Sequence, residues 1–293
     1  MSIYAIAGVS GNTGSVVADT LLAQGIRVRV IVRDAAKGAA FAARGAEVVV
    51  ASLSDGAALT RALTGVDGAY LLLPPDVVTL TPLEDNAKRT AILAEAIRAA
   101  KVPHVVLLSS VGAQHATGTG PIRALHVAER ELAPAKTGAA LTAIRAASFQ
   151  ENWGTALGML GQGVLPTFVS KTVRYPQVAT RDIGRTAAAA LVEGGKGFQI
   201  VELSGPRDYT AEDAATALSA ITGKPVVAQD APLEAVVPTF TSFGLSAPVA
   251  ALFREMYEGI VSGQVVWEGG AARAVRGTVT LDDTLRTLLA PKT

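Results

Sequence analysis

The sequence predicts an α/β protein with a doubly wound parallel sheet and a smaller, interleaved C-terminal α/β substrate domain. Short apolar segments alternate with helical patterns through about the first 145 residues, joined by short turns. The first segment, Ile3–Ala7, leads directly into a glycine-rich turn and a helical pattern. We expect residues 1–150 to form the sheet domain and residues 151–293 to form mainly the substrate domain, with returns of the chain to the sheet near 180–205.

Size and composition indicate a compact globular protein. The 293 residues are 49% hydrophobic and 17% charged, which suffices for a large core. The net charge of +1 gives no reason to expect a nucleic-acid partner. The chain has no cysteine and three histidines without an acidic cluster, so we expect no metal site. The chain starts directly with the first strand, and no stretch reaches the length of a membrane span; we therefore expect a cytoplasmic protein without a membrane segment.

The glycine-rich turn reads Gly-Val-Ser-Gly-Asn-Thr-Gly over residues 8–14. Its three glycines permit a tight turn and let the backbone approach a pyrophosphate, whose charge would lie at the helix N-terminus. The spacing is GxxGxxG and not the more common GxGxxG. We expect a dinucleotide to be bound here by Gly8, Ser10, Gly11, Asn12, Thr13 and Gly14.

The second predicted strand, Arg27–Val32, is followed by Arg33, and this residue indicates which cofactor is bound. An acidic side chain at this place would bind the ribose 2′-hydroxyl of NAD, whereas arginine suits the 2′-phosphate of NADP. Lys37 could add a second positive charge. The alternative is that Arg33 and Lys37 are solvated surface charges. We predict NADP(H) in preference to NAD(H).

Further strands are expected at 47–51, 69–73, 104–108 and 141–145. Helices are expected at 34–44, 83–101 and 121–133, and another should begin at a cap, Ser54 or Asp55, and end at residue 63. In doubly wound sheets the ligand lies beyond the carboxyl ends of the strands. The expected cofactor site therefore also includes Ser52, Leu53, Leu73, Pro74 and Ser109.

The second half has a less regular order of elements and carries aromatic residues at turns and on helix faces. We expect a strand at 199–203 that returns to the main sheet and a short strand at 226–228. One helix is expected to begin at residue 181, and four more are expected at 211–221, 233–240, 247–262 and 282–289. Thr210 and Asp213 have the spacing of a capping box.

Several motifs together resemble the NmrA-like branch of the atypical short-chain dehydrogenases, which includes NADPH:quinone oxidoreductases. The matching segments are 8–14, 30–34 with Lys37, 63–67, 105–112, 141–145, 149–152, 182–184 and 202–206. The resemblance implies a Rossmann-type domain that binds NADP(H) and a smaller C-terminal domain that closes over the substrate cleft.

The chain departs from that superfamily at the catalytic dyad, which is usually Tyr-x-x-x-Lys on the helix after the fifth strand. None of the five tyrosines lies between residues 101 and 150, and Pro121 and Leu125 stand where tyrosine and lysine are expected. Ordinary alcohol–carbonyl chemistry and sugar-nucleotide epimerisation are therefore not expected. Ser52 also replaces the acidic residue often found after the third strand, which weakens adenine recognition by a carboxylate.

Three residues are candidates for catalysis. His126 lies on the helix that borders the nicotinamide in the resembling family, and imidazole can transfer a proton near neutral pH. Ser110, or its neighbour Ser109, could bond a substrate carbonyl, and Asn152 could contact a planar ring. Each has a structural alternative: a surface histidine, a turn hydroxyl, and a helix start beside a packed Trp153.

We therefore predict an NADPH-dependent oxidoreductase that reduces a quinone-like or other planar, electron-poor small molecule by hydride transfer. Such acceptors need less help from a dedicated proton donor, so positioning can supply much of the rate. Two alternatives stay open: a non-catalytic NADP(H)-binding redox sensor that engages a protein partner, and a tailoring reductase of a biosynthetic pathway. A homodimer is compatible with each.

Overall fold

The computed structural model describes residues 2–290. Its central sheet consists of β1 (Ile3–Ala7), β2 (Arg27–Val32), β3 (Glu47–Val50), β4 (Gly68–Leu71), β5 (His104–Ser110), β6 (Ala140–Ala146), β10 (Phe198–Ser204) and β13 (Arg273–Arg276). The bounds of the predicted strands, including the one that returns to the sheet as β10, lie within two residues of those observed. Strand β13 was not predicted.

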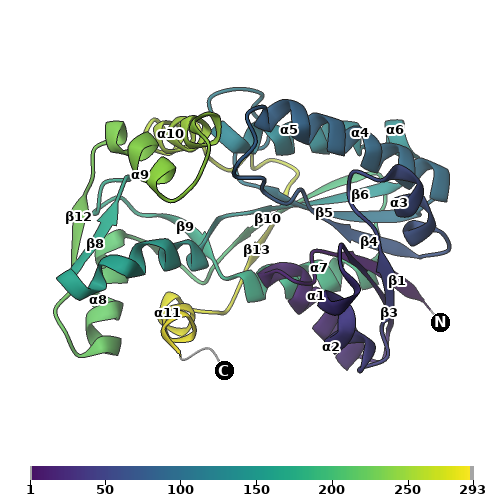
Figure 1. Ribbon diagram of the computed structural model, residues 1–293, viewed down its shortest axis with the longest axis horizontal. Helices are drawn as coiled ribbons and strands as arrows, with labels where there is room; N and C mark the ends of the chain where they lie inside the picture. The colour runs from purple at the N-terminus through teal and green to yellow at the C-terminus, as the bar shows by residue number, and fades with distance from the viewer. Residues whose placement is uncertain (1, 291–293) are drawn as a thin grey trace.

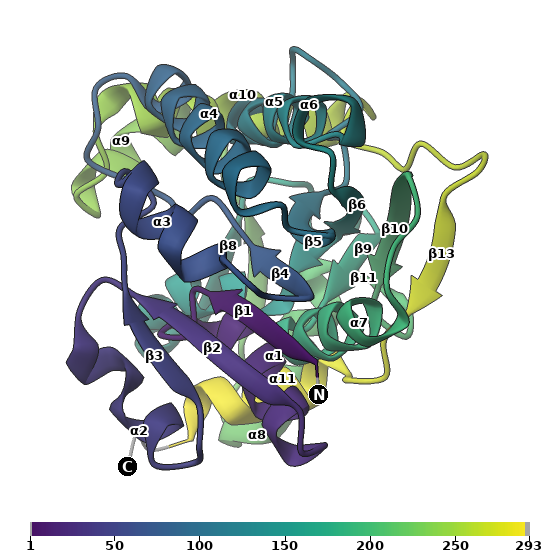
Figure 2. The ribbon, with the colours of Figure 1, turned by 90° about the vertical axis from the view of Figure 1, so that its right-hand side faces the viewer.

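All eight strands are parallel, in the order β13-β10-β6-β5-β4-β1-β2-β3 (Figure 2). The chain winds outward in both directions from β1 and β4, so the switch point of the sheet lies between these strands. This confirms the predicted doubly wound fold. Because every strand runs the same way, all carboxyl ends lie at one edge, which is where ligands of such sheets bind.

Helices cover both faces of the sheet (Figures 1 and 2). On one face lie α1 (Asn12–Ala23), α2 (Ala39–Ala42) and α7 (Thr180–Glu193), and on the other α3 (Gly56–Leu63), α4 (Pro82–Ala100), α5 (Arg123–Glu131) and α6 (Pro134–Thr137). Strand β1 shows why both faces are closed. Tyr4 and Ile6 belong to the core beneath α1 and α7, whereas Ile3 and Ala5 belong to the core beneath α3 and α4. Such alternation in an apolar run is typical of a strand buried on both sides.

Three predicted helices are interrupted in the structure. Residues 34–44 form a 3₁₀ turn, η1 (Ala35–Gly38), and the single turn α2, and residues 121–133 begin as a 3₁₀ turn, η2 (Gly120–Ile122), before α5. The third, at residues 233–240, begins as a 3₁₀ turn, η4 (Leu233–Ala235), before α9 (Val236–Ser242). At the first break Gly38 packs so close to Val48 that a Cβ would lie 2.7 Å from its Cγ1. The need for this close approach, with glycine's poor helix propensity, prevents a continuous helix.

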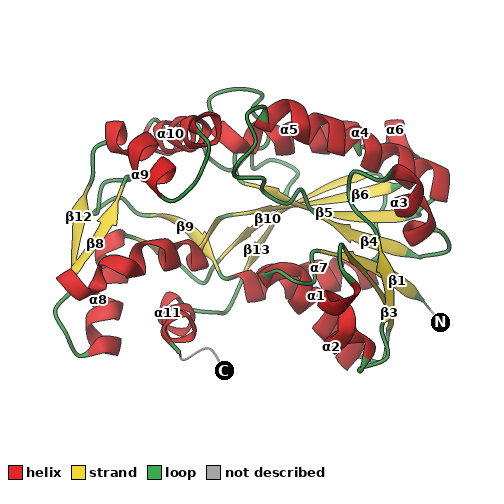
Figure 3. Cartoon of the chain, viewed as in Figure 1, coloured by secondary structure: helices red, strands yellow, loops and turns green. Residues whose placement is uncertain are grey.

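The remaining elements form a smaller region, at the left of Figure 3. Its strands are β7 (Ser148–Phe149), β8 (Val164–Thr167), β9 (Tyr175–Val178), β11 (Asp208–Tyr209) and β12 (Val227–Asp230), in two small sheets. Its helices are η3 (Gln150–Gln162), α8 (Ala211–Thr222), η4 (Leu233–Ala235), α9 (Val236–Ser242), α10 (Ala247–Val261) and α11 (Leu281–Leu289). The chain returns to the main sheet from this region through α7 and β10, and again through β13. Of the helices described, none combines the length and apolar character needed to cross a bilayer.

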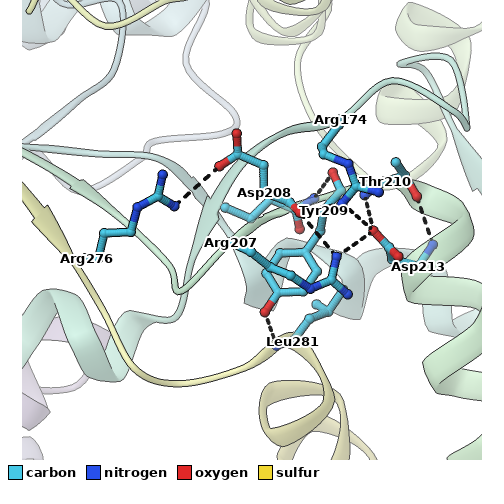
Figure 4. A network of polar contacts seen from close by, with 9 residues as sticks. Arg174, Arg207, Asp208, Tyr209, Thr210, Asp213, Arg276 and Leu281 are labelled. Atoms are coloured by element: carbon cyan, nitrogen blue, oxygen red, sulfur yellow. Dashed lines mark hydrogen bonds and ion pairs between the residues drawn. The ribbon is translucent and has the colours of Figure 1, made fainter.

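Within this smaller region, a polar network fastens the start of α11 to β11 and α8 (Figure 4). Arg174 and Arg207 each donate to Asp213 at 3.1 Å, at the start of α8. The hydroxyl of Tyr209, in the adjoining strand β11, accepts the backbone N–H of Leu281 at 3.2 Å. The network thus joins three segments that are far apart in the sequence.

Candidate functional site

The predicted cofactor residues follow the carboxyl ends of five neighbouring strands, so they gather at one edge of the sheet. The turn 8–14 follows β1, Arg33 follows β2, Ser52 and Leu53 follow β3, Leu73 and Pro74 follow β4, and Ser109 lies near the end of β5. The topology alone therefore brings these segments together.

The glycine-rich turn leaves the N-terminus of α1 open. Gly8 has φ +71° and its carbonyl accepts the N–H of Gly11 at 2.9 Å. A Cβ on Gly14 would lie 2.5 Å from the carbonyl oxygens of Ala7 and Gly8, so only glycine lets α1 start this close to β1. Gly11 is the N-cap and supplies no side-chain acceptor, and the first turn carries no acidic residue. The free N–H groups of α1 thus fit an anionic group such as a pyrophosphate.

Thr13 differs from its neighbours in the turn. Ser10, Gly11 and Asn12 are exposed, whereas the side chain of Thr13 is buried and accepts a hydrogen bond from the hydroxyl of Tyr70 at 2.9 Å. Burial, partly offset by this bond, raises the pKa of Tyr70 well above its ordinary value. Thr13 therefore anchors the start of α1 to β4 through its side chain.

Arg33 and Lys37 place two positive charges beside this edge. Both side chains are exposed, and neither forms an ion pair within the described part of the chain. Asp34, which lies between them, is already used as the cap of η1, where its carboxylate accepts the N–H of Ala36 at 3.0 Å. The two charges are therefore available to a phosphate.

The other side of the expected site is mainly apolar. Leu53 and Leu73 are partly buried and pack against the core beneath α3 and α4. Pro74 is also partly buried, and the hydroxyl of Ser52 lies 2.8 Å from that of Ser54. These residues could form a wall against a flat ring, and no carboxylate is among them.

Ser109 is part of a buried ionic network. Its hydroxyl donates to Glu129 Oε1 at 2.6 Å, and Glu129 accepts two bonds from Arg145, at 2.9 Å from Nε and 2.7 Å from Nη2. Arg145 also pairs with Glu268. Burial lowers the pKa of Arg145, but its two carboxylate partners outweigh burial and the pKa is raised. Because the Ser109 hydroxyl is committed here, a cofactor contact from this residue would have to use its backbone.

The sequence interpretation missed this network, although it contained a signal. Arg145 is the one charged residue of the buried strand β6, and Glu129 lies three residues after His126 on α5. A charge in a buried strand requires a partner of opposite charge.

The three catalytic candidates do not form one cluster. His126 Nδ1 lies 2.9 Å from the carbonyl oxygen of Ala113, which can only accept, so Nδ1 carries the proton and Nε2 is left for another partner. The hydroxyl of Ser110 donates to the carbonyl of Val111 at 3.0 Å. Asn152 is exposed and lines a cavity that neither His126 nor Ser110 lines.

This cavity has a volume of about 360 Å³, and its lining includes Ser148 and Phe149, which follow β6 after Ala147. Its remaining walls come from η3, β8, β9, α9 and α10 and the adjoining loops. No charged side chain lines it. Its aromatic members are Phe149, Trp153, Phe168, Tyr175, Phe240, Phe243 and Tyr257.

The aromatic rings of the cavity are held by packing against one another. The ring centroids of Phe168 and Tyr257 are 5.3 Å apart, and Phe240 stacks on Phe253 at 4.9 Å. Trp153 donates its indole N–H to Gln177 Oε1 at 2.9 Å, so it offers the cavity a ring and not a free donor. Such a pocket favours a flat, uncharged molecule.

A doubly wound sheet with an open helix N-terminus after its first strand is the architecture of dinucleotide-binding α/β proteins. Comparison with known proteins narrows this class. The model of the NmrA-like family matches residues 2–261. The chain therefore belongs to the NmrA-like family, as its motifs predicted.

Three relatives illustrate the family. The NAD(P)H azoreductase of Xenophilus azovorans is 28% identical over 256 residues, covering 86% of this chain and 85% of that protein. Quinone oxidoreductase 2 of Escherichia coli strain K12 is 28% identical over 276 residues, covering 89% of each. The crystal structure of the NADPH-dependent quinone oxidoreductase QOR2 from Escherichia coli, complexed with NADPH, superposes with a TM-score of 0.82 at 25% identity, covering 98% of this chain and 100% of that one.

Proposed function

We propose that this protein uses NADPH, in preference to NADH, to reduce uncharged planar acceptors such as quinones. The broader statement, that it is an NAD(P)H-dependent oxidoreductase, was predicted from the sequence and is confirmed by its relatives. The choice of cofactor and the class of acceptor rest on the residues of this chain.

The preference for NADPH is supported by the two unpaired charges after β2. The guanidinium of Arg33 can donate two parallel hydrogen bonds to a 2′-phosphate, and Lys37 adds a second positive charge nearby. The free N–H groups at the start of α1 suit the pyrophosphate that both cofactors share. When bound, NADPH would supply a hydride to the acceptor.

The uncharged aromatic cavity is the observation that carries the choice of acceptor. Its lining includes Ser148 and Phe149, which follow the carboxyl end of β6 after Ala147, and so it reaches the edge where the cofactor is expected. A phosphate ester or sugar nucleotide would bring a charge that no residue of the lining can pair, and an unpaired buried charge is costly. A flat conjugated ring instead gains apolar burial and contacts with ring faces.

The residues at the positions of the expected Tyr-x-x-x-Lys dyad limit the chemistry that this chain itself can supply. Pro121 lies in the 3₁₀ turn before α5 and Leu125 within α5, and neither can exchange a proton. The chain's contribution to such a reaction is therefore to hold the acceptor, exclude water and orient the two reactants. Acceptors whose aromatic system spreads the added charge are the ones for which this suffices.

Two measurements test the proposal. Titration calorimetry with NADPH and NADH should show that Arg33→Ala weakens NADPH binding roughly 10- to 100-fold, as expected for loss of hydrogen bonds to a charged group, and leaves NADH binding unchanged. Arg130→Ala removes another exposed arginine and serves as the control. NADPH oxidation should then be followed with menadione and with an azo dye as acceptors.

Equal loss of NADPH and NADH binding in Arg33→Ala would contradict the preference for NADPH. Tight NADPH binding without turnover of any acceptor would contradict the reductase and favour the redox-sensor alternative. That alternative further requires different affinities for NADPH and NADP⁺, because a ligand shifts only an equilibrium whose states it distinguishes.

A further inference from the structure

We propose that Tyr175 and Tyr257 recognise an oxygen atom of the acceptor and stabilise the negative charge that this oxygen gains on reduction. The inference rests on the proposed function, since it concerns the same cavity. It assigns the polar part of acceptor recognition to two tyrosines that lie outside every motif of the sequence.

The fold brings the two tyrosines into one cavity from distant segments. Tyr175 is the first residue of β9, Tyr257 lies in α10, and both side chains line the cavity. Neither hydroxyl has a hydrogen-bond partner among residues 2–290. The ring of Tyr257 is held in place by Phe168, at 5.3 Å, and by Phe240, at 6.3 Å between centroids.

The buried polar side chains of the same wall are already satisfied within the protein. Gln177 accepts the indole N–H of Trp153 and donates to the carbonyl of Tyr209 at 3.3 Å. Thr167 donates its hydroxyl to the carbonyl of Val169 at 2.7 Å. The two phenols are therefore donors that a bound acceptor can satisfy, in surroundings where a hydrogen bond is stronger than in water.

Both phenols stay protonated at neutral pH. Burial raises the pKa of Tyr257 to about 12. Burial, together with the neighbouring Tyr257, raises the pKa of Tyr175 even further above its ordinary value. A reduced quinone oxygen is itself a phenolate, with an ordinary pKa near 10. Transfer of a proton from either tyrosine to it would be uphill, so the tyrosines act as hydrogen-bond donors and keep their protons.

The reaction balances without a protein acid. A quinone that accepts one hydride receives two electrons and one proton and becomes the hydroquinone monoanion, and the loss of that hydride would oxidise NADPH to NADP⁺. The negative charge lies on a quinone oxygen, where hydrogen bonds from the two phenols stabilise it more than they stabilise the neutral quinone. One proton from water then completes the hydroquinone, and both tyrosines are unchanged.

Binding to the cofactor-free protein provides the first test. In a Trp267→Phe background Trp153, which lines the cavity, is the remaining tryptophan, and its fluorescence reports menadione binding. Tyr175→Phe and Tyr257→Phe should each weaken menadione binding about three- to tenfold. They should change the affinity for 2-methylnaphthalene, which has the same ring system without oxygens and displaces menadione, by less than about twofold. Tyr4→Phe, in β1 and outside the cavity, should change neither.

Turnover provides the second test. Each cavity variant should lower kcat/KM for menadione by roughly 10- to 100-fold, because the hydrogen bond is stronger to the charged product-like state. The pH profile between about 6 and 9 should keep its shape, since neither tyrosine ionises there.

Several results would overturn the inference. One such result is that Tyr175→Phe and Tyr257→Phe both bind and turn over menadione as Tyr4→Phe does. If the wild type oxidises NADPH with menadione in that case, the proposed function stands and only the role of the two tyrosines fails. Equal weakening of menadione and 2-methylnaphthalene would show a purely structural role. Absence of menadione binding to the wild type would also refute it. Tyrosine-dependent menadione binding without NADPH oxidation would support the recognition and contradict the reductase.

Discussion

Replacement of Glu129 by glutamine should destabilise the protein by about 3 kcal/mol, because it removes the charge partner of a buried guanidinium. The side chains of Glu129 and Arg145 are each only 4% exposed. Arg145 makes two hydrogen bonds to Glu129, and Ser109 makes a third. Loss of one member of such a pair costs about 3–5 kcal/mol. The low end applies because Glu268, which is 46% exposed, still pairs with Arg145.

Urea unfolding followed by far-UV circular dichroism measures this effect. A chain of 293 residues has an unfolding entropy of about 0.6 kcal/mol per kelvin, so the same change should lower Tm by about 5 °C. The matched control is Glu95→Gln, which breaks the ion pair with Arg98 on the surface of α4, where the two side chains are 63% and 60% exposed. That change should cost less than about 0.5 kcal/mol. Equal effects of Glu129→Gln and Glu95→Gln would refute the reasoning.

The double variant Glu129→Leu/Arg145→Met separates the two sources of the cost. If Glu129→Leu lowers the free energy of unfolding because it leaves the buried charge of Arg145 without a partner, replacing Arg145 by methionine as well should recover stability. A double variant less stable than Glu129→Leu alone would show that the attraction between the two charges, and not their burial, dominates.

Three further predictions concern other parts of the chain. Gly14→Ala places a Cβ 2.5 Å from two backbone oxygens, so α1 must move. Calorimetry should show NADPH affinity reduced roughly 10- to 100-fold, because the hydrogen bonds from the start of α1 to a charged group are weakened. Gly158→Ala, where a Cβ meets no atom within 4 Å, should leave this affinity unchanged. Asp213→Asn should lower the free energy of unfolding by about 1 kcal/mol at pH 7. Burial alone would raise the pKa of Asp213, but the Thr210 N–H, Arg207 and Arg174 outweigh burial and lower this pKa. In urea unfolding, the difference between wild type and variant should therefore vanish as the pH falls below about 4. Burial, which outweighs the attraction of Glu193, lowers the pKa of His104; the wild type should therefore lose stability as the pH falls below about 6.5, and His104→Gln should lose less.

The sheet could be predicted from the sequence because its strands carry their own signal. Ile3–Ala7 is an apolar run of strand length, Arg27–Val32 is rich in β-branched valine and isoleucine, and both have the bounds predicted. Strand β13 has no such run: its sequence is Arg-Ala-Val-Arg, and its residues are largely exposed at the edge of the sheet. It forms a strand because it pairs with the edge strand β10, in a register that places Arg273 opposite Val201. Long-range pairing of this kind has no signature in the local sequence.

That the expected cofactor residues share one edge of the sheet was predictable for a topological reason, whereas the contacts of individual side chains were not. Parallel strands must bring their carboxyl ends together, so the turn after β1 and Arg33 after β2 share an edge whatever their sequences. The orientation of Ser109 depends on which face of β5 it occupies. Successive residues of a strand point to opposite faces, so a one-residue difference separates the committed hydroxyl of Ser109 from that of Ser110.

The aromatic cavity could not be assembled from the sequence, because its walls come from segments that lie far apart. Trp153, Phe168 and Phe240 show no common spacing, and the 3₁₀ segment η3 that carries Trp153 lacks a regular helical pattern. Only the packing of α9 and α10 against the loop that follows β8, where Phe168 contacts Phe240 and Tyr257, defines which rings face one another.

The distribution of charge explains why the missing dyad fits the chemistry proposed. The buried ions Glu129 and Arg145 neutralise each other beneath α5, and the unpaired charges of Arg33 and Lys37 lie after β2, at the opposite end of the edge from β6. The cavity itself has no charged side chain. No carboxylate or ammonium is therefore placed there to protonate an acceptor. A site of this kind serves acceptors whose reduced form holds the added charge within its own aromatic system, with hydrogen bonds from neutral donors as the only polar assistance.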